Sequence, residues 1–491
     1  MSINLMKTAS GLIALIFSSM TMAKQPIDKP NILFLLSDDQ SWSGLSVTMD
    51  PNHPDSKSKV IATPNITQLA AQGMLFSRAY APAPVCSPTR ISLQTGKSPA
   101  QLHWTKAAPV MTARDGLKLF PPSINKNIAQ SEITIAELLR QRGYATAHYG
   151  KWHIGGGGPK NHGYDESDGD TGNNDAIPHT PPNPVDIFGM GERAIDFMDR
   201  NISKGKPFFI QMSYHALHHP ENADPKLVKK YEGLMKKTSA KQSGRAALAE
   251  DLDRGVGILL AKLEALGISN NTYVVYMSDN GSGGNKLLKG GKGSLWEGGI
   301  RVPLIIRGPG IKAGQISDES IVGYDLFPTF YHLAGGNKPL PNGVEGGDIS
   351  SLLTGESGPV KRPSEDLVFH FPHYQGTTPH SVIYQDNFKL IYFYETDSSK
   401  LFDLDKDISE SQDLSLNNSK LSANLLTRLK SQLASINAQL PEMNPDYDGV
   451  TQYDPKGRKK GKGDKGKGKN KGKDKNKNKR KNKDNNGGKN Q

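Results

Sequence analysis

The only cysteine of the 491-residue chain, Cys86, stands in the run Cys-Ser-Pro-Thr-Arg at 86–90. This run follows Ala-Pro-Ala-Pro at 81–84, which favours an extended loop. Pro88 suits the first turn of a helix, and Ser87 is the expected N-cap. We therefore expect residue 86 at a helix N-terminus, where backbone N–H groups favour an anion. The alternative is an inert buried thiol, the usual state of an isolated cysteine.

Oxygen-bearing side chains occur as two adjacent pairs, Asp38-Asp39 and Asp279-Asn280. Each pair directly follows an apolar run of strand length. Carboxylate and amide oxygens form a hard ligand set that suits Ca²⁺ or, less well, Mg²⁺. One Asp-Asp pair alone would usually be a turn or a helix cap. Two pairs, each after a strand, favour a metal site instead.

A set of basic side chains could surround a small anionic group: Arg90, Lys151, His153, His218 and Lys292. Lys292 lies in Gly-Gly-Lys-Gly at 290–293, where glycines let the backbone approach a ligand closely. Taken alone, this lysine would be a solvated loop residue. The run that follows, Trp-Glu-Gly-Gly-Ile-Arg-Val-Pro at 296–303, is too particular for a plain surface loop.

These candidates need elements that hold them together. Buried strands are indicated by four apolar runs, at 31–37, 145–149, 208–214 and 273–278. Helices are indicated at 64–71, at 134–143, where Thr134 and Glu137 have the spacing of a capping box, and at 244–266. This alternation predicts an α/β fold with a large, mostly parallel central sheet and helices on both faces. Because the ligand crevice of such sheets lies beyond the carboxyl ends of the strands, the scattered candidates are expected to share one pocket.

The domain organisation follows from changes in composition. We predict a signal peptide at 1–23, an α/β catalytic domain at 24–365, a smaller C-terminal α+β subdomain with an antiparallel sheet at 366–450, and a disordered basic tail at 451–491. The subdomain is indicated by a hairpin pattern over 389–404 and a helical one over 422–440. From 455 on, the chain carries 15 Lys and 2 Arg against 3 Asp and no apolar residue, so this segment cannot form a core.

The first 23 residues resemble a secretory signal, with Lys7, an apolar run at 11–17 and Thr-Met-Ala at 21–23. We expect export, either to a periplasm or into the medium; an uncleaved interfacial anchor is the alternative. The run is too short to span a membrane, and no later stretch reaches about 18 apolar residues. With a single cysteine the chain forms no internal disulfide, so packing and any bound metal must stabilise its core.

Taken in order, these motifs resemble those of the type I, formylglycine-dependent sulfatases of the alkaline-phosphatase-like superfamily. The matching residues are Asp38-Asp39, Cys-x-Pro-x-Arg at 86–90, Gly-Lys-Trp-His at 150–153, His218, Asp279-Asn280 and Gly-Gly-Lys-Gly-x-Leu-Trp-Glu-Gly-Gly at 290–299. The resemblance runs from about 30 to 415. Near its end, Asp413 stands where the family usually has Asn, a position outside the chemistry.

The resemblance implies that a maturation enzyme converts Cys86 to formylglycine, whose hydrate is the nucleophile that attacks the sulfate ester and forms a sulfated enzyme. It implies one Ca²⁺, held by Asp38, Asp39, Asp279 and Asn280, with residue 86 completing the shell. Arg90 and Lys151 would fix the diol, and His153 would help to expel sulfate. His218 and Lys292 would lie near the leaving oxygen, and either one could be the general acid.

Residues that contact the substrate are less defined. His215, Asn173 and Asn174 are candidates, with His148, His179 and His219 as further possibilities. For His215, His148 and His219, a core or loop role is an equal alternative. The expected partner is a sulfated glycan. The basic tail could bind a polyanion, and no nucleic-acid partner is expected for an exported protein. The alternative functions are a phosphate or phosphonate ester hydrolase of the same superfamily and a non-catalytic protein that binds sulfated glycans.

Overall fold

The computed structural model describes residues 29–107, 116–176, 183–235, 239–283 and 287–454. The strands of its large sheet are β1 (Asn31–Ser37), β2 (Met74–Phe76), β5 (Ala145–Gly150), β6 (Glu166–Ser167), β7 (Phe208–Ser213), β8 (Thr272–Ser278), β9 (Leu304–Arg307) and β10 (Gln315–Ser317). An antiparallel sheet contains β12 (Leu367–Phe371), β13 (His380–Gln385), β14 (Phe388–Phe393) and β15 (Ser398–Asp403). Short pairs join β3 (Ala79–Tyr80) to β11 (Ile321–Val322), and β4 (Leu119–Phe120) to β16 (Glu442–Met443). The helices are α1 (Pro64–Ala71), α2 (Cys86–Thr95), α3 (Ile135–Gln141), α4 (Ile187–Ile202), α5 (Pro225–Leu234), α6 (Ala240–Ala265), α7 (Glu297–Ile300), α8 (Leu326–Leu333), α9 (Ser350–Leu353) and α10 (Ser419–Ser435).

The large sheet has the strand order β10-β2-β9-β8-β1-β7-β5-β6. Its neighbouring pairs are parallel except where β9 meets β2 and β8. The four-stranded sheet is antiparallel throughout, in the order β12-β13-β14-β15. The predicted fold class, a mostly parallel α/β sheet with a separate antiparallel sheet, is therefore confirmed.

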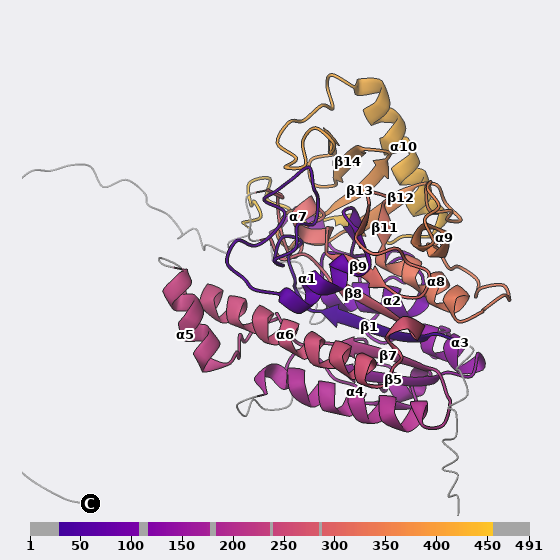
Figure 1. The fold of residues 1–491 in the computed structure, drawn as a ribbon. Coiled ribbons are helices and arrows are strands. Elements are labelled where there is room, and N and C mark those ends of the chain that lie inside the picture. Colours follow the sequence, from indigo (N-terminus) through magenta and orange to yellow (C-terminus); the bar gives the residue numbers. More distant parts are fainter. Residues whose placement is uncertain (1–28, 108–115, 177–182, 236–238, 284–286, 455–491) are drawn as a thin grey trace, which may run out of the picture. The chain divides into compact units, whose positions relative to one another are not determined.

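Strand β1 lies at the centre of the large sheet and is buried along its whole length. Successive side chains of a strand point to opposite faces. Leu33 and Leu35 therefore join one hydrophobic core with α4 and α6, while Ile32 and Phe34 join another with α2, α3 and α8. Figure 1 shows these two sets of helices on the two sides of the sheet. Such two-sided burial explains why the strand is apolar without interruption.

Most helix boundaries follow the local signals in the sequence. The capping box predicted at Thr134 forms with Glu137 and opens α3. Helix α6 begins earlier than predicted, because Ser239 and Gln242 build a second capping box. Helix α10 ends earlier than predicted, and Asn437 just beyond it has a left-handed backbone with φ 54°.

Helix α2 begins at Cys86 itself, and Val85, with an extended backbone, is its N-cap. The prediction that Ser87 is the cap is wrong, because the helix starts one residue before it. Gly96 ends α2 with a left-handed φ of 70°. The placement of residue 86 at a helix N-terminus is nevertheless as predicted.

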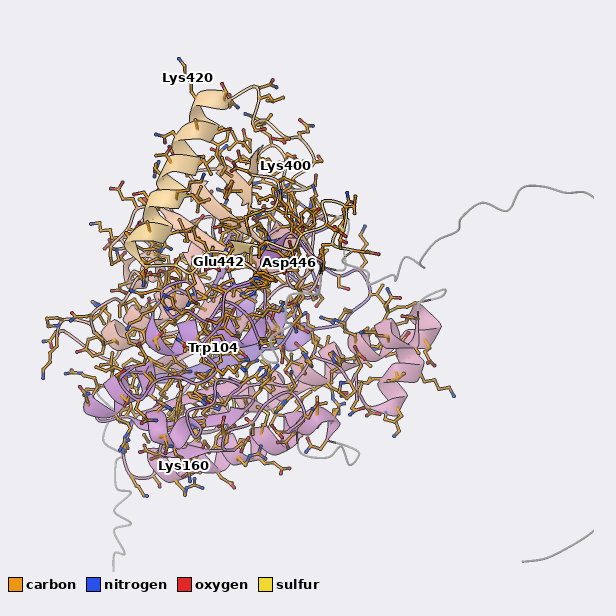
Figure 2. The ribbon with its side chains drawn as sticks, turned by 180° about the vertical axis from the view of Figure 1, so that it is seen from behind. Trp104, Lys160, Lys400, Lys420, Glu442 and Asp446 are labelled. Carbon is orange, nitrogen blue, oxygen red and sulfur yellow. The ribbon has the colours of Figure 1, made fainter. Side chains whose placement is uncertain are left out.

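The antiparallel sheet lies between α10 and the region that follows β8. On one face Ile383, Leu390 and Leu401 pack on Leu425 and Leu429 of α10. On the other face, Val382, Ile391 and Phe402 share a core with Tyr80 and Trp296. Figure 2, seen from behind, shows α10 with Lys420 and the region of Lys400 at one end of the view and Lys160 at the other. The domain boundary at 365 and 366 stays a prediction.

The stretch 155–184 contains a 3₁₀ turn at Pro159–His162 and the edge strand β6. Residues 177–182, and with them His179, lie outside the described residues. So do the predicted signal peptide at 1–23 and the tail from 455 on. Among the described residues, no helix combines the length and the apolar character that crossing a membrane requires.

Because two histidines of the antiparallel sheet are buried, we expect the protein to become less stable against unfolding in mild acid. The ring of His370 lies 2.6 Å from Ser381 Oγ, and the ring of His380 accepts a hydrogen bond from Leu295 N at 2.8 Å. Burial lowers the pKa of His370 to about 4 and that of His380 to about 3. Below the ordinary histidine pKa of about 6.5, the unfolded chain takes up protons that the folded chain does not. The free energy of unfolding is therefore expected to fall by about 1.5 kcal/mol per histidine from pH 6.5 to pH 5.

Denaturant unfolding at the two pH values would measure this loss. A His370→Gln/His380→Gln variant should lose clearly less stability on acidification than the unaltered protein. His332→Gln is the matched control, because that side chain is 62% exposed. Equal pH dependence in the double variant and the unaltered protein would contradict the assignment.

Candidate active site and metal centre

Strands β8, β1, β7 and β5 are neighbours in the large sheet, and each leads directly to candidate residues. Asp279 and Asn280 follow β8, Asp38 and Asp39 follow β1, His218 lies beyond β7, and Lys151 and His153 follow β5. The strands are in parallel register, with Ser37 opposite Ser278 and Leu36 opposite Ser213. Their carboxyl ends therefore lie at one edge of the sheet, as the sequence predicts.

The acidic side chains form one buried cluster. A ligand atom from each of Asp38, Asp39, Cys86 and Asp279 lies within 4.8 Å of the others. Asn280 Nδ2 donates to Asp39 Oδ1 at 2.7 Å, and Asp39 N donates to Asp279 Oδ1 at 3.1 Å. Asp39 also adopts a left-handed backbone with φ 61°, a conformation that is uncommon for residues other than glycine.

Two observations support a hard cation in this cluster. Asn280 Oδ1 is buried and has no hydrogen-bond partner among the described residues. Burial, and then the negative charge of Asp38, raise the pKa of Asp279. A cation bound by these oxygens would relieve the repulsion between the carboxylates. The donor set thus fits Ca²⁺ or Mg²⁺.

Basic side chains surround the same cluster. Arg90 lies one helical turn after Cys86, and it donates to Asp279 Oδ2 through Nε at 3.1 Å and Nη2 at 2.7 Å. Lys151 Nζ donates to Asp38 Oδ2 at 2.5 Å, and Lys292 Nζ lies 2.7 Å from Asp39 Oδ1. Burial alone would raise the pKa of Asp38, but the charges of Lys151 and Arg90 hold it well below its usual range.

The thiol of Cys86 stands between these charges. Its Sγ lies 3.4 Å from Asp38 Oδ1 and 3.4 Å from Lys292 Nζ, and the residue is 2% exposed. Burial, followed by the carboxylate of Asp38, raises the pKa of the thiol to about 12. An unmodified thiol is therefore protonated at neutral pH, and the thiol form is a poor nucleophile.

Three histidines near the cluster are neutral. Burial and then the charge of Lys151 lower the pKa of His153 and of His215 to about 3 each. Burial also lowers the pKa of His218. His218 Nδ1 lies 2.7 Å from the carbonyl oxygen of His219. Because a carbonyl only accepts, Nδ1 carries the proton and Nε2 is the nitrogen left for exchange with a ligand.

The other substrate candidates differ in position. His148 packs against Trp152 and Tyr164 and bonds Ser213 Oγ at 3.0 Å, so it is a core histidine. The ring of His219 stacks on that of His218, and its residue is exposed.

The loop that carries Asn173 and Asn174 adjoins the site through Thr171. His153 N donates to Thr171 O at 2.7 Å, so the chain just before the two asparagines pairs with a candidate catalytic residue. Asn174 is exposed, and Asn173 Oδ1 is buried without a hydrogen-bond partner among the described residues.

A buried charge network behind Lys292 was not predicted from the sequence. Lys389 Nζ, on β14, lies 2.8 Å from Glu297 Oε1 and 2.7 Å from Glu410 Oε1, and all three side chains are fully buried. Glu297 follows the glycine-rich loop of Lys292, so the network ties this loop to the antiparallel sheet. Gly299 needs to be glycine, because a Cβ there would lie 1.9 Å from Ser294 O. The only signal in the sequence was the specific run at 296–303.

Arg245, on α6, is a second residue that the sequence did not point to. Its guanidinium donates to the carbonyl oxygen of Asp39. No motif marks this residue, since it stands in an ordinary helical pattern.

Taken together, the site holds a hard-cation ligand set, a residue able to carry a nucleophile, and several cations. This combination is suited to binding a tetrahedral oxyanion and displacing one of its esters.

Comparisons with known proteins agree with this chemistry. Two family models match: Sulfatase, over residues 30–336, and N-sulphoglucosamine sulphohydrolase, C-terminal, over 291–439. The chain is 31% identical over 396 residues to arylsulfatase A of Homo sapiens, covering 70% of this chain and 71% of that protein. It is 32% identical over 398 residues to N-acetylgalactosamine-6-sulfatase of Mus musculus, covering 71% of each. A crystal structure described as Ps i-CgsB in complex with k-i-k-neocarrahexaose superposes with a TM-score of 0.69 at 26% identity, covering 82% of this chain and 93% of that chain.

Proposed function

The chain belongs to the sulfatase family and is a sulfuric ester hydrolase, and we propose that its substrate is a sulfated carbohydrate attacked by a formylglycine made from Cys86. The observation that carries this proposal is the position of Cys86. Its Sγ lies in the acidic cluster, 3.4 Å from both Asp38 Oδ1 and Lys292 Nζ. A buried, protonated thiol has little use there, whereas an aldehyde hydrate would place a hydroxyl beside a cation site and a lysine.

Asp38, Asp39, Asp279 and Asn280 are the proposed ligands of one Ca²⁺, with residue 86 as a further ligand. When bound, the cation would polarise a sulfate oxygen and lower the pKa of the hydrate hydroxyl. Arg90 contributes by holding Asp279 in place through two hydrogen bonds. The same guanidinium donates to Lys151 O at 2.5 Å, which positions the start of the segment after β5.

The remaining groups act on the sulfate and on the leaving oxygen. Lys151 and Lys292 offset the negative charge that otherwise repels a nucleophile from a sulfate ester. Lys292 Nζ, or His218 Nε2 once it has taken up a proton, would protonate the leaving alkoxide, a step that contributes about 10²–10⁴-fold in general acid catalysis. Attack on sulfur would leave residue 86 sulfated. The second hydroxyl of the hydrate, deprotonated with help from His153, would then expel sulfate and restore the aldehyde.

A carbohydrate substrate is supported by what related proteins are described as binding. The Ps i-CgsB structure is a complex with k-i-k-neocarrahexaose, and the mouse relative is named N-acetylgalactosamine-6-sulfatase. We further propose that residues 1–23 direct export to a periplasm or into the medium, and that a formylglycine-generating enzyme matures Cys86. The basic tail at 451–491 is proposed to bind a polyanion, for which a sulfated glycan is the natural choice in that compartment.

The modification can be tested directly by mass spectrometry of the peptide that contains Cys86. In formylglycine the peptide has lost one sulfur and two hydrogens and gained one oxygen relative to the thiol. We expect this form in an active preparation made together with a maturation enzyme, and the thiol form in an inactive one made without it. Full activity in a preparation that contains only the thiol would overturn the proposed nucleophile.

The substrate class is tested by paired assays on the mature protein. Release of sulfate from sulfated oligosaccharides should exceed release of phosphate from the corresponding phosphate esters by orders of magnitude. A preference for phosphate would instead support the alternative hydrolase of the same superfamily. Binding of sulfated glycans without any release of sulfate would support the non-catalytic alternative.

A further inference from the structure

A cavity of about 410 Å³ adjoins the candidate active site, and none of the proposed catalytic residues lines it. We call it the side cavity. Its volume lies within the range of about 300–1,000 Å³ that is typical of small-molecule sites. Its wall includes Gln40, Leu217, Ser282 and Gly283, which lie in the segments that follow β1, β7 and β8. These strands are neighbours in the sheet, so the side cavity lies at the same edge as the acidic cluster.

The connection to the metal centre is close. Gln40 directly follows Asp39, and Leu217 directly precedes His218. Leu217 N donates to Asp38 O at 2.6 Å, which joins the segment after β7 to the metal-binding loop. Arg245 lines the side cavity and also donates to the carbonyl oxygen of Asp39. A ligand in the side cavity would therefore contact Gln40 and Leu217, the sequence neighbours of Asp39 and His218.

The charge of the lining has a single sign. Lys57, Lys59 and Arg245 line the side cavity, and no Asp or Glu is among its lining residues. The ion pair of Lys59 with Asp55 is between side chains that are 75% and 71% exposed, so it restrains Lys59 only weakly. This excess of positive charge favours an anionic ligand.

The rest of the lining is largely apolar. Val60, Ile61, Leu217, Met235, Ala246 and Ala249 contribute to the wall, and Val60 is 39% exposed although it is a large hydrophobic residue. A sugar ring presents apolar C–H faces and polar edges. An apolar wall with cationic groups beside it therefore matches a sugar unit that carries an anionic substituent.

We propose that the side cavity binds the sugar unit next to the one that carries the scissile sulfate, and that Lys57, Lys59 and Arg245 pair with an anionic group on that unit. The proposal rests on the carbohydrate substrate proposed above and narrows it to glycans with anionic groups on adjacent units. Sulfate and carboxylate share the required charge. The side cavity thus gives the protein a preference for oligosaccharides over small sulfate esters.

The test compares the mature full-length protein with a Lys57→Ala/Lys59→Ala variant. The substrates are 4-nitrophenyl sulfate, k-i-k-neocarrahexaose, and two glycosaminoglycan hexasaccharides, one with sulfate and carboxylate groups on adjacent units and one with its carboxylates reduced to alcohols. For a hexasaccharide that is hydrolysed and has adjacent anionic groups, we expect the variant's kcat/KM to be about tenfold lower than that of the unaltered protein, because KM rises. The variant's kcat/KM should also depend less on salt concentration. The fall with 4-nitrophenyl sulfate should be several times smaller, because that ester has no second unit.

The control is Lys160→Ala/Lys420→Ala, which removes the same charge at two exposed positions that do not line the side cavity and that lie at opposite ends of the view in Figure 2. It should leave kcat/KM for every substrate unchanged, and all variants keep the basic tail, so its contribution cancels. A fall in kcat/KM of the Lys57→Ala/Lys59→Ala variant with neocarrahexaose would identify sulfate as the anionic group. A fall that is seen with the carboxylate-bearing hexasaccharide and is lost after its carboxylates are reduced would identify carboxylate.

Two outcomes would overturn the proposed role of the side cavity while leaving the carbohydrate substrate in place. One is equal kcat/KM values in the Lys57→Ala/Lys59→Ala variant and the unaltered protein. The other is an equal fall in kcat/KM for 4-nitrophenyl sulfate and the hexasaccharide. Hydrolysis of 4-nitrophenyl sulfate without hydrolysis of any hexasaccharide by the unaltered protein would overturn the carbohydrate substrate, and the side cavity with it.

Discussion

A Cys86→Ala variant is expected to lose hydrolysis of sulfate esters by at least about 10⁴-fold, the scale seen when a nucleophile is removed from a covalent enzyme. Residue 86 is the first residue of α2 and stands 3.4 Å from a carboxylate and from an ammonium group. Alanine keeps the helix, because Val85 rather than a side chain at 86 provides the N-cap. The loss should therefore come from the chemistry and not from the fold. Initial rates of sulfate release and a thermal unfolding curve would measure the two effects separately.

Ser92→Ala is the matched control for this experiment. Ser92 lies on the same helix, is fully buried, and its Oγ has no hydrogen-bond partner among the described residues. The control variant should keep its activity and its unfolding temperature. If Cys86→Ala retained more than about one hundredth of the activity, residue 86 would not be the nucleophile.

Replacing Lys389 by methionine is expected to destabilise the protein by about 3–5 kcal/mol, the cost of removing one partner from a buried ion pair. Lys389 is fully buried and lies 2.8 Å from Glu297 and 2.7 Å from Glu410. Without it, two carboxylates remain in the interior with no lysine between them. Burial, and a missing countercharge, would then favour uptake of a proton at this pair. Denaturant unfolding at neutral pH would measure the loss.

Two further variants are the controls for the Lys389→Met variant. Lys400→Met removes a lysine of the same sheet that is 46% exposed and lies 3.9 Å from Asp413, so it should cost less than about 1 kcal/mol. A triple variant, Glu297→Gln/Lys389→Met/Glu410→Gln, removes the charges together and should regain most of the stability. A Lys389→Met variant as stable as Lys400→Met would show that the network contributes little. Because Glu297 follows the loop of Lys292, we also expect Lys389→Met to lower the activity of the molecules that remain folded.

Local patterns in the sequence were sufficient for the elements and for the main candidates. Mostly apolar runs predicted β1, β5, β7 and β8, since strands buried on both faces carry few polar residues. The capping box at Thr134 predicted the start of α3, because its hydrogen bonds form within one helical turn. Polar residues directly after buried strands predicted one common site, because parallel strands end at the same edge of a sheet.

The sequence by itself determined that acidic and basic candidates would lie directly beyond the ends of strands, because which residues follow each strand is a local property. Only the tertiary structure decided which partners each one meets. It pairs Arg90 with Asp279, and it places His148 in the core rather than in the site. It also joins Glu297 to Lys389 and Glu410, which are 92 and 113 residues away. Such contacts depend on how distant elements pack, and no periodicity or spacing within one segment records that packing.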